Sequence, residues 1–247
     1  MTSLRNMLFT APLLLALAAC GGAETGDAAL DGEVAAAVAP PAGATWSATA
    51  VRTAEGGWLV GNPDAPIKLV EYGSLTCPAC ALFSTEGSAK LHADYIDSGR
   101  VSYELRSVLI HGVVDLVLTR ILDCAPVTSA VPLADQLWAA NNTVTSGFQA
   151  NAPALEQAMT LPENQRFAEL ARIGGLSDFF AARGMSADQT KVCLADDAAI
   201  KALTEKTGAQ TEKDGVNSTP TFILNGQKLD ISRWSEVEAA LQRAGAR

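Results

Sequence analysis

Two cysteines in the run Cys-Pro-Ala-Cys at residues 77–80 constrain this chain most, because they stand where a strand gives way to a helix. Residues 67–72 are a short, largely apolar run, which is typical of a buried strand. We expect a helix from Cys77 to Ile96. Pro78 suits its first turn, because the missing N–H would have no intrahelical partner there. The sequence therefore predicts two thiols at a strand-to-helix turn.

The position of Cys77 at a helix N-terminus favours redox chemistry. Unsatisfied N–H groups and the helix dipole stabilise a thiolate and lower the pKa of the thiol. A thiolate is the species that attacks or leaves in disulfide exchange, and Cys80 lies one turn on, where it can close the pair. The alternatives are a structural disulfide or half of a zinc site. A zinc site usually needs a second pair of Cys or His ligands, which the sequence lacks, so we expect neither metal nor cofactor.

The remaining pattern predicts an α/β protein with a helical insertion. Residues 101–106 alternate as a strand does, which completes a strand–helix–strand unit. Residues 112–208 are mostly helical in pattern, broken by Pro and Gly. Strand patterns return at 219–224 and 227–231, joined by Asn225-Gly226, a strong hairpin signal, and a last helix is expected at 233–244. The expected core positions of the first helix are Leu82, Phe83, Leu91 and Tyr95.

Two stretches, residues 67–80 and residues 215–226, resemble the thioredoxin superfamily and, within it, the DsbA-type oxidoreductases of bacterial envelopes. The resemblance covers roughly Trp58 to Arg247. It implies a thioredoxin fold with a helical subdomain inserted between Cys77 and Pro220. The expected organisation is a lipoprotein signal peptide at 1–19, a flexible tether at 20–50, the first half of the thioredoxin fold at 51–111, the helical subdomain at 112–208 and the second half at 209–247.

The resemblance also implies roles for individual residues. The Thr219–Pro220 bond would be cis and would face the two cysteines, with Thr219, Pro78 and Ala79 contacting an extended substrate. Glu71 would lie beneath the site and take a proton from Cys80. The alternatives are an ordinary strand-start proline at 220 and an edge-strand Glu71 that reaches solvent.

Ala79 departs from the family pattern. Many DsbA-type oxidases have His at this position, where it favours the thiolate. With Ala79 the reduced form should be less stabilised and the protein a weaker oxidant, by tens of millivolts. The departure leaves the direction of electron flow open, but not the class of reaction.

The first twenty residues predict export. An apolar run of about 13 residues fits the core of a signal peptide and is too short for a transmembrane helix. It ends in Leu-Ala-Ala-Cys at residues 17–20, which resembles a bacterial lipobox and implies lipidation of Cys20. The alternative is an ordinary signal peptide in which Cys20 is incidental. We expect a periplasmic protein that is lipid-anchored to an envelope membrane. The net charge of −9 argues against nucleic acid as a partner.

Two cysteines remain once Cys20 is assigned to lipidation and Cys77 and Cys80 to the redox pair. We expect Cys124 and Cys193 to form a structural disulfide in the helical subdomain, the alternative being two buried free thiols. A second redox pair that reloads the first is a further alternative. Neither histidine of the chain, His92 or His111, indicates a metal site, and a structural role is expected for both.

The predicted function is disulfide exchange with exported proteins that carry cysteines, most simply as an oxidase that a membrane redox partner regenerates. A reductase or isomerase is the alternative within the same class. A non-catalytic assembly lipoprotein, with Cys77 and Cys80 as a permanent disulfide, is the alternative from another class.

Overall fold

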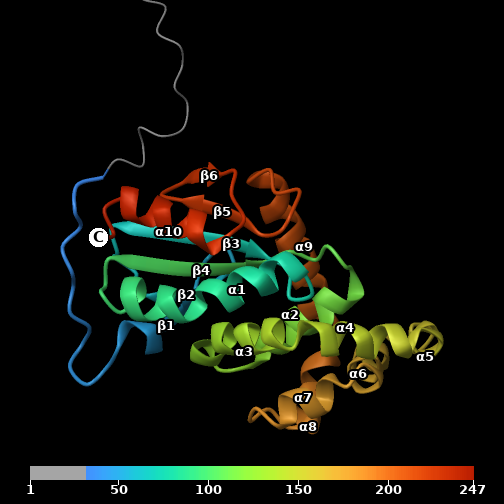
Figure 1. Ribbon diagram of the computed structural model, residues 1–247. Helices are drawn as coiled ribbons and strands as arrows, with labels where there is room; N and C mark the ends of the chain where they lie inside the picture. Colours follow the sequence, from blue (N-terminus) through green and yellow to red (C-terminus); the bar gives the residue numbers. More distant parts are fainter. Residues whose placement is uncertain (1–31) are drawn as a thin grey trace, which may run out of the picture.

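A six-stranded mixed sheet forms the centre of the computed structural model, which describes residues 32–247 (Figure 1). The strands are β1 (Ala50–Arg52), β2 (Trp58–Gly61), β3 (Ile67–Gly73), β4 (Val101–Ser107), β5 (Thr221–Leu224) and β6 (Gln227–Leu229). Their order across the sheet is β1-β2-β4-β3-β5-β6, with β3 and β4 parallel and the other neighbours antiparallel. The predicted signal peptide and Cys20 lie outside the described residues.

Helix α1 (Pro78–Lys90) and the π-helical turn η3 (Leu91–Ile96) make the crossover between β3 and β4. Phe83 contacts Phe222 of β5, with ring centroids 4.6 Å apart. It also contacts Trp234 of helix α10 (Trp234–Arg243), at 6.1 Å. One face of the sheet is thus covered by α1 and α10. Of the four expected core positions of the first helix, only Leu82 was wrong: it is 41% exposed, whereas the other three are buried.

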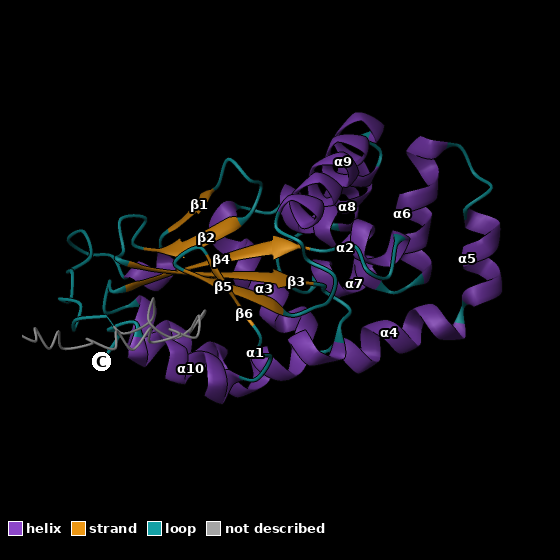
Figure 2. Cartoon of the chain, turned by 90° about the horizontal axis from the view of Figure 1, so that it is seen from above, coloured by secondary structure: helices purple, strands orange, loops and turns teal. Residues whose placement is uncertain are grey.

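Most of the helical insertion lies beyond the carboxyl ends of β3 and β4, as the view from above shows (Figure 2), whereas its helix Val127–Ala139 packs against α1, β1 and β2. Its helices are α2 (Val113–Cys124), α3 (Val127–Ala139), α4 (Asn141–Ala150), α5 (Ala152–Ala158), α6 (Glu163–Ile173), α7 (Leu176–Ala181), α8 (Ala187–Leu194) and α9 (Asp197–Lys213). Helix α3 packs against α1, and Asp214, at the end of α9, accepts a hydrogen bond from Tyr72 of β3. The insertion therefore contacts both the helix that carries the two thiols and the strand before it.

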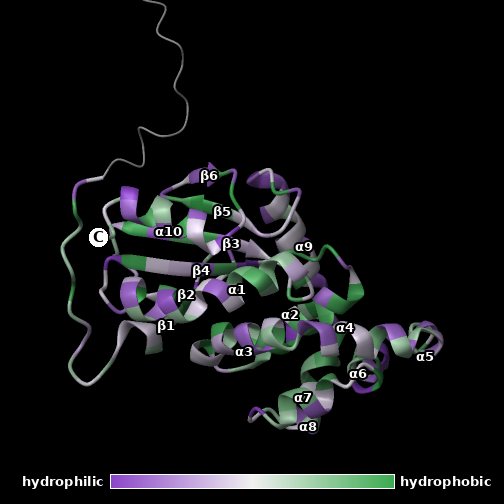
Figure 3. Cartoon of the chain, in the orientation of Figure 1, coloured by the Kyte–Doolittle hydropathy of each residue, from purple (hydrophilic) through white to green (hydrophobic). Residues whose placement is uncertain are grey.

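Apolar residues concentrate on β3, β5 and α2 (Figure 3), which explains why these elements form the interior. The two faces of β3 differ. Ile67, Leu69 and Glu71 point to the face that α1 covers, and all three are buried. Lys68, on the opposite face, is exposed. The predicted thioredoxin fold with a helical insertion is confirmed.

Part of the segment expected to be a flexible tether is packed in the structure. The stretch 32–45, here called the N-terminal strap, lies across the amino ends of β3 and β4. Its Val38 N–H donates to the carbonyl of Ser98, and its Gly32 N–H donates to the carbonyl of Arg243. Trp46, next along the chain, donates its indole N–H to the carbonyl of Val38 at 2.7 Å. Among residues 32–247 no helix combines the length and apolarity that a membrane crossing needs.

Candidate active site

Cys77 is the N-cap residue of α1, and Pro78 follows in the first turn. Its pKa falls from 9.0 to about 5, chiefly through a hydrogen bond from the Cys80 thiol, against an opposing effect of burial. The Thr219 side chain and the backbone N–H groups of Cys80 and Ala79 lower the pKa further. The start of a helix therefore stabilises a thiolate at Cys77.

Cys80 is fully buried, and its pKa is raised far above the usual range by burial, by the hydrogen bond to Cys77 and by the charge of Glu71. Both thiols are free in the structure. Pro78 and Ala79, between them, are exposed. The Cys77 sulfur is thus available as a thiolate, whereas the Cys80 thiol keeps its proton.

The Thr219–Pro220 peptide bond is cis. The carbonyl oxygen of Thr219 lies 3.4 Å from Cys77 Sγ, across 142 positions of sequence. Pro220 is buried immediately before β5, and Thr219 is half-buried with a hydroxyl group that lacks a hydrogen-bond partner among the described residues. The two stretches that carried the family resemblance therefore meet at the thiols.

Glu71 is fully buried on the face of β3 toward α1, which excludes the alternative of an edge residue reaching solvent. Tyr103 of β4 donates its hydroxyl to Glu71 Oε2 at 2.6 Å, while Oε1 has no partner among residues 32–247. Burial raises the pKa of Glu71 to about 8; the Tyr103 hydrogen bond opposes the rise, and the charge of Asp135 adds to it. At neutral pH this acid holds a proton beside Cys80.

A buried carboxylate, Asp115 of α2, organises the loop before Cys77. Asp115 is fully buried and accepts hydrogen bonds from the hydroxyl groups of Ser74 and Thr76 at 2.9 Å each. It also accepts from the backbone N–H of Thr76 at 3.2 Å and of His111 at 2.9 Å. The His111 ring reaches the Thr76 hydroxyl at 2.6 Å. The insertion thereby fixes the residues that lead into the helix.

Sequence reasoning missed three residues of this environment: Tyr103, Asp115 and Asp135. The alternation of residues 101–106 could have placed Tyr103 on the same face of the sheet as Glu71, because β3 and β4 pair in parallel register. The two aspartates lie in helices of the insertion, where no local pattern shows that they point at the loop and at α1. Within residues 32–247, no three His, Cys, Asp or Glu side chains gather as metal ligands would.

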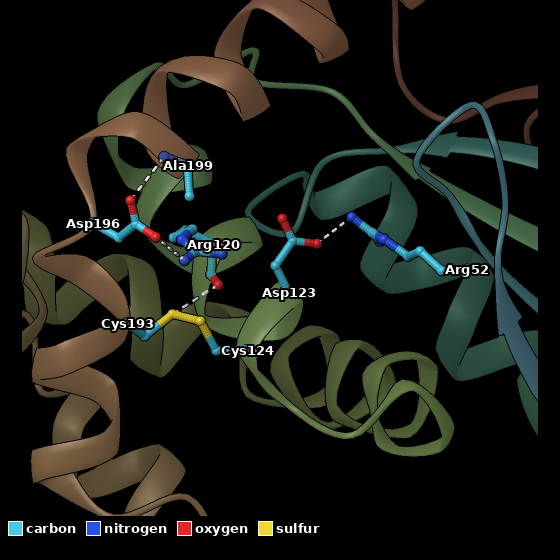
Figure 4. The surroundings of a disulfide bond; sticks show 7 residues. All are labelled: Arg52, Arg120, Asp123, Cys124, Cys193, Asp196 and Ala199. Atoms are coloured by element: carbon cyan, nitrogen blue, oxygen red, sulfur yellow. Dashed lines mark hydrogen bonds and ion pairs between the residues drawn. A yellow bond between two sulfur atoms is a disulfide. The ribbon is translucent and has the colours of Figure 1, made fainter.

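Cys124 and Cys193 are joined by a disulfide that links the end of α2 to α8, across a sequence separation of 69 (Figure 4). Around it, Arg120 pairs with Asp196 at 3.6 Å, and Asp123 pairs with Arg52 of β1. Asp196 also caps α9 by accepting from the N–H of Ala199 at 3.0 Å. The disulfide therefore joins the first helix of the helical subdomain to a helix near its end.

The fold and the site define a class: a thioredoxin fold of the DsbA type, with a dithiol at the start of α1, a cis proline opposite it and a helical insertion. The sequence model of the family described as thioredoxin matches residues 53–243, and the chain belongs to this family.

Known proteins show the same likeness. A Rickettsia bellii protein named "Putative protein-disulfide oxidoreductase" is 25% identical over 190 residues, which cover 77% of this chain. The chain spans 65% of the length of that relative. The structure of protein-disulfide isomerase from Novosphingobium aromaticivorans is 26% identical and superposes with a TM-score of 0.68, covering 74% of this chain and 94% of that one. Wolbachia pipientis alpha-DsbA1, at 20% identity, shares the fold with a TM-score of 0.61, over 76% of this chain and 89% of that one.

Proposed function

We propose that the protein is a thiol–disulfide oxidoreductase that exchanges disulfides with exported proteins through Cys77 and Cys80, and that it acts as an oxidase. The difference between the two thiols carries the proposal. The pKa of Cys77 is lowered to about 5, whereas that of Cys80 is raised. Such an arrangement makes Cys77 a good leaving group and leaves Cys80 to open and close the internal disulfide.

The reaction starts from the oxidised pair. A substrate thiolate attacks Cys77 Sγ, the Cys77–Cys80 bond breaks, and Cys80 leaves with the electron pair and takes a proton. A second substrate thiolate then attacks the substrate sulfur of the mixed disulfide and displaces Cys77 as a thiolate. The substrate gains a disulfide, the protein is reduced by two electrons, and a membrane redox partner reoxidises it. Thr219 and Pro220 would hold the substrate backbone, with Pro78 and Ala79 beneath it.

Glu71 supplies the proton for Cys80 in this direction and removes it in the reverse one. Its pKa of about 8 leaves it protonated at neutral pH, and its charge acts on Cys80. The transfer moves the negative charge from the Cys80 sulfur to the Glu71 carboxylate, which accepts a hydrogen bond from Tyr103. Oxidation of a substrate and the reverse reaction thus use the same carboxyl group, that of Glu71.

Ala79 supports the alternative direction. It presents no imidazole to the thiolate, so the reduced form is stabilised less than in an oxidase that has His there. The similarity to a solved protein-disulfide isomerase also supports a reductase or isomerase. Both alternatives use the same pair of thiols.

The proposed setting is the periplasm, with the chain anchored to an envelope membrane through a lipid on Cys20. Two observations support it. A disulfide at Cys124–Cys193 is typical of an oxidising compartment. The apolar run before Cys20 ends in a lipobox-like sequence. Mass spectrometry of Cys20 in a membrane fraction tests this part.

Trapping of mixed disulfides tests the exchange itself. In Cys80→Ala no neighbouring thiol can attack the mixed disulfide between Cys77 and a substrate, so disulfides with exported proteins should accumulate and disappear on reduction. The double variant Cys77→Ala/Cys80→Ala is the matched control and should trap nothing. A Cys80→Ala variant that is folded but forms no adducts would favour the static scaffold.

The reduction potential decides the direction. A potential above about −200 mV, measured against a glutathione series, fits a disulfide donor, because it is more oxidising than the glutathione poise. A value near or below about −250 mV would favour a reductase.

A further inference from the structure

The two carboxyl oxygens of Glu71 have different surroundings. Oε2 accepts a hydrogen bond from the Tyr103 hydroxyl at 2.6 Å, whereas Oε1 has no partner among residues 32–247. Glu71 is fully buried and Tyr103 is only 3% exposed. Tyr103 of β4 is the register partner of Leu69, two residues before Glu71 in β3, so the phenol and the acid lie on the same face of the sheet. The parallel register therefore brings the phenol to one carboxyl oxygen.

The unpartnered oxygen lies against the backbone that contacts Cys80. A methyl group on Gly73 would stand 3.1 Å from Glu71 Oε1, which places this oxygen at the end of β3. Ser74 is the next residue, and its backbone forms a hydrogen bond with the buried thiol. Burial, Cys77 and the charge of Glu71 raise the pKa of Cys80, and the hydrogen bond from the Ser74 backbone lowers it. Glu71 Oε1 and the Cys80 sulfur therefore approach the same peptide unit, between Gly73 and Ser74.

The hydrogen bond from Tyr103 favours one position for the acidic proton. Burial raises the pKa of Glu71 to about 8, so the carboxyl group is neutral at neutral pH. Tyr103 keeps its own proton, because burial raises its pKa well above the usual range. The carbonyl oxygen of a neutral acid is its better hydrogen-bond acceptor. Tyr103 thus favours the form in which Oε2 is the carbonyl oxygen and Oε1 carries the proton.

We propose that Tyr103 is a positioning residue for disulfide exchange: by binding Oε2 of Glu71 it directs the acidic proton to Oε1, the oxygen from which Cys80 is protonated. The inference rests on the proposed function. When a substrate thiolate bonds to the Cys77 sulfur, the Cys77–Cys80 bond breaks, and Cys80 leaves with its electron pair and takes the proton from Oε1. The remaining carboxylate keeps the hydrogen bond from Tyr103, which is stronger to a charged acceptor, and later regains a proton from water.

The variant Tyr103→Phe removes the hydroxyl group and keeps the ring. The first measurement is the carbonyl infrared absorption of Glu71 in the oxidised full chain, with Glu71→Gln as the reference that identifies the band. The band of the protonated acid should move to higher wavenumber, because its carbonyl oxygen loses a hydrogen bond. The Tyr103 hydrogen bond opposes the effect of burial on the pKa of Glu71, so the titration midpoint should rise by on the order of one pH unit relative to wild type.

The second measurement is the rate at which reduced glutathione opens the Cys77–Cys80 disulfide. The rate should fall severalfold in Tyr103→Phe, because the proton is no longer directed to the oxygen near Cys80. In a Glu71→Gln background the same substitution should leave the rate unchanged, since the group through which Tyr103 acts is gone. Asp135, whose charge also raises the pKa of Glu71, is the same in all these variants.

Tyr95→Phe is the matched control. Tyr95 is likewise buried, at 5% exposure, and donates its hydroxyl to a carboxylate, Oε1 of Glu238, at 2.8 Å. Its loss should lower the midpoint of thermal unfolding, as a purely structural hydrogen bond does. It should leave the Glu71 band and the rate of disulfide opening at their wild-type values.

The inference is overturned if folded Tyr103→Phe keeps the wild-type band or the wild-type rate, or if Tyr95→Phe changes them equally. If Tyr103→Phe does not fold, the wild-type band decides, because a band at the position of a carbonyl without a hydrogen bond would also overturn the inference. Failure of the proposed function looks different: Cys80→Ala would trap no exported protein, while the Glu71 band would still respond to the loss of the Tyr103 hydroxyl.

Discussion

Cys77 Sγ lies 3.4 Å from the carbonyl oxygen of Thr219, in a segment that the helical insertion separates from it in sequence. This contact joins the reactive thiol to the residue before the cis bond. A substrate bonded to Cys77 would lie beside the backbone at Thr219. The reactive sulfur and the proposed docking backbone form one surface.

The Thr219 hydroxyl should tune the reactive thiol. The Thr219 side chain lowers the pKa of Cys77, so Thr219→Val, which keeps the shape and removes the hydroxyl, should raise that pKa from about 5. Thiolate absorbance in the ultraviolet, followed against pH in the reduced protein, measures it. The exposed neighbour Ser218→Ala is the control and should leave the titration unchanged. An unchanged midpoint in Thr219→Val would show that the hydroxyl plays no part.

Glu71 should make the protein lose stability as pH rises. Its folded pKa of about 8 lies above its ordinary value of 4.5, so the folded state binds the proton more tightly than the unfolded chain does. Stability is then retained below pH 4.5 and lost as pH rises toward 8. Glu71→Gln removes this loss. Relative to wild type it should gain on the order of 4 kcal/mol between pH 5 and pH 8.

Urea unfolding of the oxidised protein measures the effect, because the two active-site thiols do not titrate in that form. The exposed Glu205→Gln is the control and should follow the wild-type dependence on pH. If wild type and Glu71→Gln show parallel pH profiles, Glu71 is not held protonated by the fold.

Removal of the Cys124–Cys193 disulfide should destabilise the insertion. The bond spans a sequence separation of 69, for which constraint of the unfolded chain contributes on the order of 3–5 kcal/mol. The double variant Cys124→Ala/Cys193→Ala should lose about this much in denaturant unfolding, while the Cys77 titration stays near 5. A shift of that titration would mean that the disulfide also controls the site.

Loss of Asp115 should damage the fold near the thiols more than loss of a surface acid. Asp115→Ala leaves the hydroxyl groups of Ser74 and Thr76 without their buried acceptor. We expect a loss of about 3 kcal/mol in unfolding free energy. The exposed Asp230→Ala should change stability by less than about 0.5 kcal/mol. Equal losses of unfolding free energy in the two variants would show that Asp115 does not stabilise the loop before Cys77.

The thiol motif and its strand could be predicted because their signals are local. The apolar run of residues 67–72 and the Cys-Pro-Ala-Cys turn each fix a backbone conformation within a few residues. The Asn225-Gly226 hairpin is equally local, with Asn225 at φ 49° and Gly226 at φ 84°. The conformation of these elements is therefore determined by residues that are close together in the sequence.

The N-terminal strap and the first hairpin could not be predicted in this way. The strap has no periodicity, and contacts with distant segments hold it, such as Arg100 Nε to the carbonyl of Ala35 at 2.7 Å. Strands β1 and β2 are too short to show alternation. Likewise, Asp135 becomes meaningful only when α3 is laid against α1. Tertiary contacts, not local preference, place these residues.

The strap and the thiols lie at opposite ends of the sheet. The strap leaves the domain at the amino ends of β3 and β4, whereas Cys77 stands at their carboxyl ends (Figure 1). If the chain is anchored through Cys20, as proposed, the anchored segment joins the domain at the end of the sheet opposite Cys77. Under the proposed anchoring, the thiols would lie at the end of the sheet remote from the point where the anchored segment joins the domain.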